Sequence, residues 1–272
     1  MLEFELFRRL IREAFGLEYP PNKRELLRTR LDGRLRANGL RRYGEYYRFL
    51  SYEPRDSNEW RAFADAITNN ETYFFRDGKQ LAAVAHVVPA LCAGRSGPFR
   101  VLSAGCSSGE EAYGLAMALA TTLGRQARFE VQGVDLSDSK LAEARAGRYQ
   151  SKSFHADEPP PLGIQIDEYM TRELDGAHVV RPYLREKVAF DRANLAEART
   201  LRTLGEFDIV FCRNVLIYVE DEALARFFAS LGALVRPGGY LFLGHSDRLD
   251  GSATQFRLIR VGELFAYVRS AP

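Results

Sequence analysis

The apolar residues at the start of the chain recur at helical spacing. Those separated by three or four positions are Phe4, Phe7, Leu10, Ile11 and Phe15, followed by Leu27, Leu31 and Leu35. This period places them on one face of each helix. Proline and glycine interrupt the pattern at Pro20-Pro21, Asn38-Gly39, Gly44 and Glu53-Pro54, where we expect helices to end. Residues 1–67 are therefore predicted to form a small all-α domain.

From Phe99 onward β-rich segments alternate with helical ones, which is the pattern of a mostly parallel sheet covered by helices. The predicted strands are Phe99–Gly105, Phe129–Asp135, Val188–Asn194, Phe207–Asn214 and Gly239–His245, with helices after the first, second and fourth. The last two runs, Phe256–Val261 and Leu264–Arg269, are joined by only two residues and should pair antiparallel. We assign residues 99–272 to this α/β domain and residues 68–98 to a linker and the first helix of the domain.

One segment interrupts the alternation of strands and helices. Between Phe154 and Lys187 the chain has three consecutive prolines and then two β-like runs around an Asp175-Gly176 turn. We predict a small inserted β-subdomain over about residues 156–190.

Charge is balanced over the whole chain but uneven along it. Lys+Arg total 38 and Asp+Glu 36, a formal charge of +2, which argues against a protein that coats nucleic acid. Residues 1–55 nevertheless hold 13 basic residues against eight acids. The helical domain is therefore a positive module.

The chain shows no signal peptide and no apolar run approaching 18 residues, so we expect neither export nor insertion into a membrane. Its three cysteines, Cys92, Cys106 and Cys212, have no metal-like spacing, and neither do the four histidines. We expect a cytoplasmic protein with no metal site.

A glycine-rich turn joins the first predicted strand to its helix in the segment VLSAGCSSGEEAYGLAMALA, residues 101–120. Gly105 and Gly109 allow a tight turn, but neither a phosphate loop nor a dinucleotide fingerprint is present. Glu110 and Glu111 would repel a pyrophosphate and suit a cationic ligand such as a sulfonium or an ammonium group. A purely structural turn, with the acids stabilising the helix dipole, is the alternative.

Polar residues also follow the next strands. Asp135 ends the second strand, where an acid in such sheets receives ribose hydroxyls; capping the next helix is the alternative, although Ser137 can do that alone. Asn194 and Asn214 end two further strands and could read an adenine base, unless they are ordinary strand ends.

The junction between the two domains is rich in side chains that can bind a ligand. It reads Thr68, Asn69, then NETYFFR over residues 70–76. Asn70 and Thr72 can orient a ligand, Phe74 and Phe75 can wall a pocket, and Arg76 can clamp a carboxylate. The alternative is a buried strap whose polar groups satisfy the backbone.

The strings TNNETYFFR, SAGCSSGEEAYGLA, FCRNVLIYV and GGYLFLGHSD resemble, in order and spacing, the signature blocks of the CheR-type chemotaxis-receptor methyltransferases. The resemblance covers nearly the whole chain and implies a Rossmann-like S-adenosylmethionine methyltransferase sheet with an all-α N-terminal domain and an inserted β-subdomain. It implies a cofactor site made of Asn70, Thr72, Arg76, Glu111, Asp135, Asn194, Leu195, Asn214 and Val215. Arg76 and Tyr218 are the candidates for holding the acceptor.

The implied reaction transfers a methyl group from S-adenosylmethionine to glutamate side chains of a chemoreceptor and releases S-adenosylhomocysteine. A glutamate is already ionised near neutral pH, so no general base is needed and no histidine is assigned a chemical role. The receptor's helical domain would dock on the basic helices through Arg24, Arg28 and Arg34. Some relatives also bind a receptor tail peptide on the inserted subdomain, which is more compact here, so that partner is the weaker expectation.

Two other functions stay open at this stage. A methyltransferase acting on a small molecule or RNA is permitted by the basic helices, but Tyr43, Tyr46 and Tyr47 sit at helical spacing, unlike a base-stacking platform, so we expect no nucleic-acid partner. The other is a non-catalytic adaptor that binds the cofactor.

Overall fold

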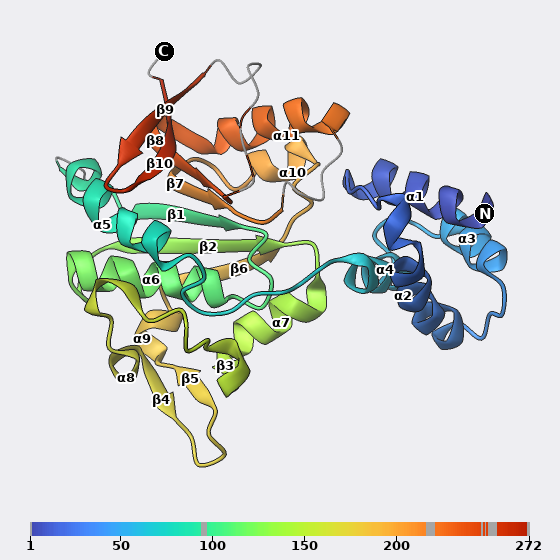
Figure 1. Ribbon diagram of the computed structural model, residues 1–272, viewed down its shortest axis with the longest axis horizontal. Helices are drawn as coiled ribbons and strands as arrows, with labels where there is room; N and C mark the ends of the chain where they lie inside the picture. The colour runs from blue at the N-terminus through green and yellow to red at the C-terminus, as the bar shows by residue number, and fades with distance from the viewer. Residues whose placement is uncertain are drawn as a thin grey trace.

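The computed structural model describes residues 2–93, 97–215, 221–245, 247, 249 and 255–270. Four helices form the N-terminal part of the chain (Figure 1): α1 (Leu2–Phe15), α2 (Arg24–Ala37), α3 (Tyr43–Tyr52) and α4 (Asn58–Ile67), with a 3-10 turn at Pro21–Lys23. The predicted apolar stripes meet in one core, in which Phe7, Ile11, Leu27, Tyr46 and Phe63 are fully buried. Gly44 does not end a helix as predicted. It lies in the first turn of α3, where its N–H donates to Glu3.

A partly buried ion pair ties α2 to α4. The Arg34 guanidinium donates to both carboxylate oxygens of Glu59, with Nε 3.0 Å from Oε1, and the Tyr46 hydroxyl donates to Oε1 at 2.6 Å. Burial of the Glu59 carboxyl acts to raise its pKa, but the hydrogen bonds from Arg34 and Tyr46 outweigh burial and lower the pKa. Arg34 therefore holds the domain together, and the prediction that it docks the receptor is not supported by its position.

We expect Glu59→Gln to lower the free energy of unfolding by about 1.5–3 kcal/mol at pH 7, the range for hydrogen bonds to a charged group. A lowered pKa means that this stabilisation is present above the ordinary Glu pKa and is lost as the pH falls through the folded-state value. Urea unfolding should therefore give Glu59→Gln a lower free energy of unfolding than the unaltered protein at pH 7. In acid the two free energies should be similar. Glu13→Gln is the control, because Glu13 makes only an exposed pair with Arg9. Equal losses from both variants would contradict the prediction.

The second part of the chain is a seven-stranded sheet with the order β6-β2-β1-β7-β8-β10-β9. Its strands are β1 (Phe99–Ala104), β2 (Phe129–Asp135), β6 (Val188–Arg192), β7 (Phe207–Cys212), β8 (Val235–Leu243), β9 (Phe256–Val261) and β10 (Leu264–Arg269). The first five in spatial order are parallel, and β10 runs antiparallel to both of its neighbours. β6 and β7 each end two residues before the predicted bound, so Asn194 and Asn214 leave the sheet at its carboxyl edge.

Helices cover both faces of this sheet (Figure 1). α5 (Gly78–Cys92) and α6 (Glu110–Leu123) share one apolar cluster with alternate strand residues such as Val101 and Ile209. α10 (Ala198–Arg202) and α11 (Asp221–Leu234) share the other cluster, with Leu102 and Val210. α7 (Asp138–Ala146) contacts α4, where Arg61 of α4 pairs with Asp138 at 3.1 Å. The helical domain is thus packed against the carboxyl side of β2.

A three-stranded antiparallel sheet, β3-β5-β4, forms the predicted insert. It consists of β3 (Arg148–Tyr149), β4 (Met170–Arg172) and β5 (His178–Val180), with short turns and helices at Ser151–Ser153, Pro161–Gly163, α8 (Ile166–Tyr169) and α9 (Pro182–Arg185). Gly176 turns the β4–β5 hairpin with φ +85°. The small sheet takes in β3, before the predicted start of the insert, and residues from Val188 onward belong to the main sheet. Among the described residues, no helix has the length and apolarity needed to cross a membrane.

Candidate active site

A cavity lies at the carboxyl edge of the sheet, where the segments after β1, β2, β6 and β7 meet the strap between α4 and α5. The nine residues of the predicted cofactor site all line this cavity: Asn70, Thr72, Arg76, Glu111, Asp135, Asn194, Leu195, Asn214 and Val215. The carboxyl ends of neighbouring parallel strands converge, which is why residues so far apart in sequence meet here. Tyr218 lies outside the described residues.

The turn between β1 and α6 forms the floor of the cavity. Gly105, Ser107 and Gly109 have φ values of +83°, +49° and +92°, in the left-handed region. A Cβ on Gly105 would lie 2.4 Å from Cγ2 of Val215, so the two cavity walls are in direct contact there. Glycine at position 105 is required both by the backbone angle and by this approach.

Asp135 is held in place by the backbone of that turn. Its Oδ2 accepts the N–H of Ser107 at 2.8 Å, and its Oδ1 accepts the N–H of Ser137 at 2.9 Å. Burial raises the pKa of the carboxyl, against the lowering effect of these two hydrogen bonds. Ser137 caps α7 through its own side chain, so Asp135 is not needed as the cap. Each carboxylate oxygen keeps acceptor capacity for a ligand hydroxyl.

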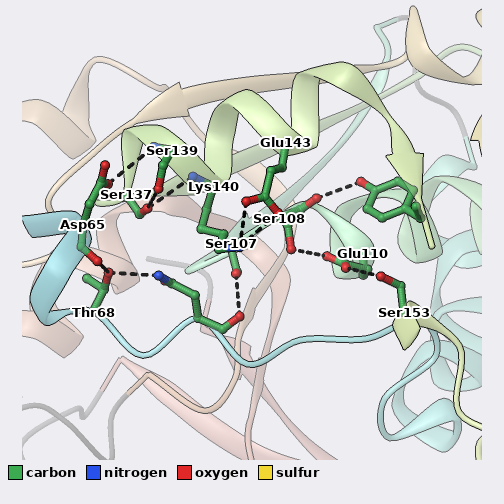
Figure 2. Close-up of polar contacts among 12 residues, drawn as sticks. Asp65, Thr68, Ser107, Ser108, Glu110, Ser137, Ser139, Lys140, Glu143 and Ser153 are labelled. Atoms are coloured by element: carbon green, nitrogen blue, oxygen red, sulfur yellow. Dashed lines mark hydrogen bonds and ion pairs between the residues drawn. The ribbon is translucent and has the colours of Figure 1, made fainter. Parts of the chain in front are cut away.

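The two acids at the start of α6 face different surroundings. Glu110 is buried and accepts hydrogen bonds from the hydroxyls of Ser108 at 2.8 Å and Ser153 at 3.0 Å, as Figure 2 shows. Burial raises the pKa of Glu110. It fastens the turn after β3 and does not line the cavity, contrary to the prediction that both acids would face a cationic ligand.

Glu111 faces the cavity and is already paired. Its Oε1 accepts the Ser103 hydroxyl at 2.7 Å, and its Oε2 accepts Nε of Arg213 at 2.6 Å. Arg213 also lines the cavity and was not among the predicted site residues. The sequence contained a signal for it, since an arginine interrupts an otherwise apolar run directly after β7.

The strap from Thr68 to Arg76 lines the cavity and is tied to the turn between β1 and α6. The Ser107 hydroxyl donates to the backbone oxygen of Asn70 at 3.0 Å, and the Asn70 amide donates to Thr68 at 3.1 Å (Figure 2). Phe74 and Phe75 do not wall the pocket as predicted. Both are buried in the main core, and Tyr73 lines the cavity instead.

The Asn194 amide is used within the protein. Its nitrogen donates to the backbone oxygen of Ala14 at 2.9 Å, and its oxygen accepts the N–H of Ala196 at 3.0 Å. This joins the end of α1 to the segment after β6. Because both polar atoms of this amide are hydrogen-bonded within the protein, Asn194 is better suited to holding the cavity wall than to reading an adenine base. Asn214, with φ +57°, remains at the cavity edge.

The helical domain supplies one wall of the cavity, which sequence reasoning missed. Its lining residues are Phe15, Leu17, Glu18, Tyr19, Lys23, Leu26, Arg30 and Ile67. Nη1 of Arg30 donates to the Tyr19 hydroxyl at 2.5 Å and to the backbone oxygen of Ile67 at 2.6 Å, so this wall is fastened to the start of the strap. No local pattern marks these residues, because they belong to ordinary amphipathic helices and a loop.

The sheet order, the glycine turn and an acid at the end of β2 together define an α/β domain that binds an adenine nucleoside at the carboxyl edge of its sheet. Residues 70–264 match the family described as CheR methyltransferase, SAM binding domain, and residues 2–68 match CheR methyltransferase, all-alpha domain. The chain belongs to the CheR methyltransferase family.

Curated relatives match over most of the chain. It is 33% identical to chemotaxis protein methyltransferase 1 of Pseudomonas aeruginosa, over 95% of this chain and 94% of the relative. It is 35% identical to the chemotaxis protein methyltransferase of Escherichia coli K12, over 94% of this chain and 87% of the relative. A probable biofilm formation methyltransferase, WspC, of Pseudomonas putida is 33% identical over 97% of this chain, which spans 61% of that protein. The chain is thus a methyltransferase that uses S-adenosylmethionine.

Proposed function

We propose that the protein is a glutamate O-methyltransferase that acts on the cytoplasmic helical domain of a chemoreceptor. The observation that carries this proposal is the composition of the cavity wall. Four cationic side chains line the same cavity as the proposed cofactor residues, together with the acids Glu18, Glu71, Glu111 and Asp135. Of these cations Arg213 is paired with Glu111, whereas Lys23 and Arg30 come from the helical domain and Arg76 from the strap. An anionic acceptor entering there would meet positive charge from both the helical domain and the strap. The match to the chemotaxis methyltransferases supports the same substrate class.

The residues present suit the cofactor. When bound, S-adenosylmethionine supplies a methyl group activated by a cationic sulfonium. Asp135 would accept the ribose hydroxyls, because both of its oxygens are oriented by backbone N–H groups and retain acceptor capacity. Glu111 would meet the cationic end of the cofactor. The remaining proposed contacts are Asn70, Thr72, Arg76, Asn194, Leu195, Asn214 and Val215.

The chain's contribution to catalysis is then positioning. A glutamate acceptor is ionised near neutral pH and needs no base from the protein. Arg76 and Tyr218 would hold the acceptor carboxylate, and the walls from the two domains would exclude water around it. Within the described part of the chain Cys92, Cys106 and Cys212 form no disulfide bond, which agrees with the cytoplasmic location that this substrate requires.

The proposal is tested by incubating the protein with tritiated S-adenosylmethionine and a receptor cytoplasmic fragment. We expect label on the receptor that is released by mild base, as a methyl ester is. A fragment whose acceptor glutamates are replaced by alanine is the matched control and should take up no label. Label that resists base, or that appears only on RNA or a small molecule, would reject glutamate methylation; binding of cofactor without any transfer would indicate the adaptor.

Docking of the receptor is proposed to use the exposed part of the basic helix α2. Arg24 and Arg28 lie four residues apart and are exposed, and Arg28 makes a 3.2 Å hydrogen bond to Tyr43 and a 3.9 Å contact with Glu25. Arg34 is excluded from this surface by its pair with Glu59. A receptor tail peptide on the inserted sheet stays a secondary proposal.

We expect Arg24→Glu with Arg28→Glu to raise KM for the receptor, most strongly at low salt, because charge attraction is screened over about 8 Å at physiological ionic strength. The affinity for S-adenosylhomocysteine should not change. Arg199→Glu with Arg202→Glu, on exposed positions of α10, makes the same change in net charge away from α2. If both double variants have the same receptor kinetics at low salt, docking on α2 is wrong.

A further inference from the structure

Arg213 is a buried arginine that lines the cavity, and the proposed function assigns it no role. The residue is 6% exposed. Its Nε donates to Glu111 at 2.6 Å, and its Nη1 donates to the backbone oxygen of Arg76 at 2.9 Å. The same Nη1 lies 3.5 Å from Oδ2 of Asp77. One guanidinium therefore connects a cofactor-facing acid in α6 with the backbone of the strap.

The strap is strained where Arg213 holds it. Phe75 and Asp77, on either side of Arg76, have φ values of +63° and +53°. Left-handed backbone is unfavourable for a residue with a side chain, so surrounding contacts must hold it. Phe75 is buried in the core, and Asp77 is held by Arg213 and by Nε2 of His245 at 2.9 Å. These contacts hold the backbone on either side of Arg76, whose Nη1 donates to the backbone oxygen of Glu71 at 3.2 Å.

Arg213 has the chemistry for this task. Its planar fork can donate to a carboxylate and a carbonyl at the same time, which a lysine ammonium on a flexible stem cannot do with the same geometry. Glu111 is itself fixed by the Ser103 hydroxyl, so the fork is anchored to the central strand β1. The turn at Phe75–Asp77 is thereby anchored to the rigid sheet.

We propose that Arg213 is a positioning residue that locks the Phe75–Asp77 turn onto Glu111 and so directs the Arg76 side chain into the cavity. The inference rests on the proposed function through the role of Arg76. This positioning role differs from that of an ordinary buried ion pair. Removing an ordinary pair would destabilise the fold without acting through one particular side chain.

The test is a double-mutant cycle of Arg213→Lys and Arg76→Ala, read in methyl transfer and in calorimetric affinity for S-adenosylhomocysteine. We expect Arg213→Lys alone to lower methyl transfer or cofactor affinity on the order of 10- to 100-fold, as displaced positioning groups do. In the Arg76→Ala background the same change should cost less than about twofold, since residues that act as a unit are not additive. A loss confined to kcat would assign Arg76 to the acceptor, and a loss in affinity would assign it to the cofactor.

Arg236→Lys is the matched control, because Arg236 pairs with the buried Asp208 near the amino ends of β7 and β8, away from the cavity. The Arg236→Lys variant should leave both methyl transfer and affinity for S-adenosylhomocysteine unchanged. Should Arg213→Lys fail to fold, Arg213→Gln, which leaves Glu111 in place, is read in the same two backgrounds.

Equal losses from Arg213→Lys with and without Arg76 would overturn the positioning role while leaving the proposed function intact. If Arg76→Ala changes neither rate nor affinity, the proposed role of Arg76 fails and the inference fails with it. The methyl-ester assay on the unaltered protein is independent of both results.

Discussion

Gly105→Ala should abolish tight cofactor binding and destabilise the fold. The backbone at position 105 has φ +83°, which costs alanine roughly 1–2 kcal/mol, and the new Cβ would lie 2.4 Å from Cγ2 of Val215. Such overpacking adds about 1–3 kcal/mol. Because Val215 lines the cavity, relieving the clash moves the cavity wall itself. Urea unfolding and calorimetry with S-adenosylhomocysteine measure the two effects separately.

Gly124→Ala separates strain from crowding. Gly124 also has a left-handed φ, +90°, but a Cβ there would meet nothing within 4 Å. This variant should lose stability from the backbone angle alone and keep its cofactor affinity. Adding Val215→Ala to Gly105→Ala should recover part of the lost stability. If Gly105→Ala behaves like Gly124→Ala in both measurements, the contact with Val215 does not shape the site.

Asp135→Ala should weaken binding of S-adenosylhomocysteine by about 1.5–3 kcal/mol, the range for hydrogen bonds to a charged group, or roughly 10- to 150-fold. The ionised carboxylate is the form that accepts ribose hydroxyls, and burial raises its pKa. Affinity should therefore be full at high pH and fall as the pH drops through a pKa above the ordinary Asp value. Calorimetry across this range measures both the loss and its pH dependence.

Asp138→Ala is the control for that variant. Asp138 lies three residues further on and pairs with Arg61 at 3.1 Å and Arg192 at 3.6 Å outside the cavity. Its removal should affect stability and leave affinity nearly unchanged. A folded Asp135→Ala protein that binds as tightly as the Asp138→Ala protein would remove Asp135 from the cofactor site.

The pattern of the sequence determined the helices, the strands and the edge at which the site lies. Apolar residues with a period of 3.6 or 2 can be satisfied only by amphipathic helices and by strands in a covered sheet. The predicted bounds of β2, β9 and β10 agree with the structure. Polar residues directly after several buried strands pointed to one crevice, because parallel strands end at the same edge. The nine predicted cofactor residues accordingly line one cavity.

Only the tertiary structure decided which charges face that cavity and which are used elsewhere. Glu110 and Glu111 are neighbours in sequence, yet one ties down the insert and the other pairs with Arg213, 102 residues away. In the sequence Arg34 resembles its exposed neighbours on α2. Only the fold brings it to its partner Glu59, which lies 25 residues further along the chain. A charged side chain has no preference that a local pattern can reveal, since its energy depends on the partner and the burial that long-range packing provides. The wall from the helical domain was unpredictable for the same reason, because it exists only once two separately patterned domains are packed together.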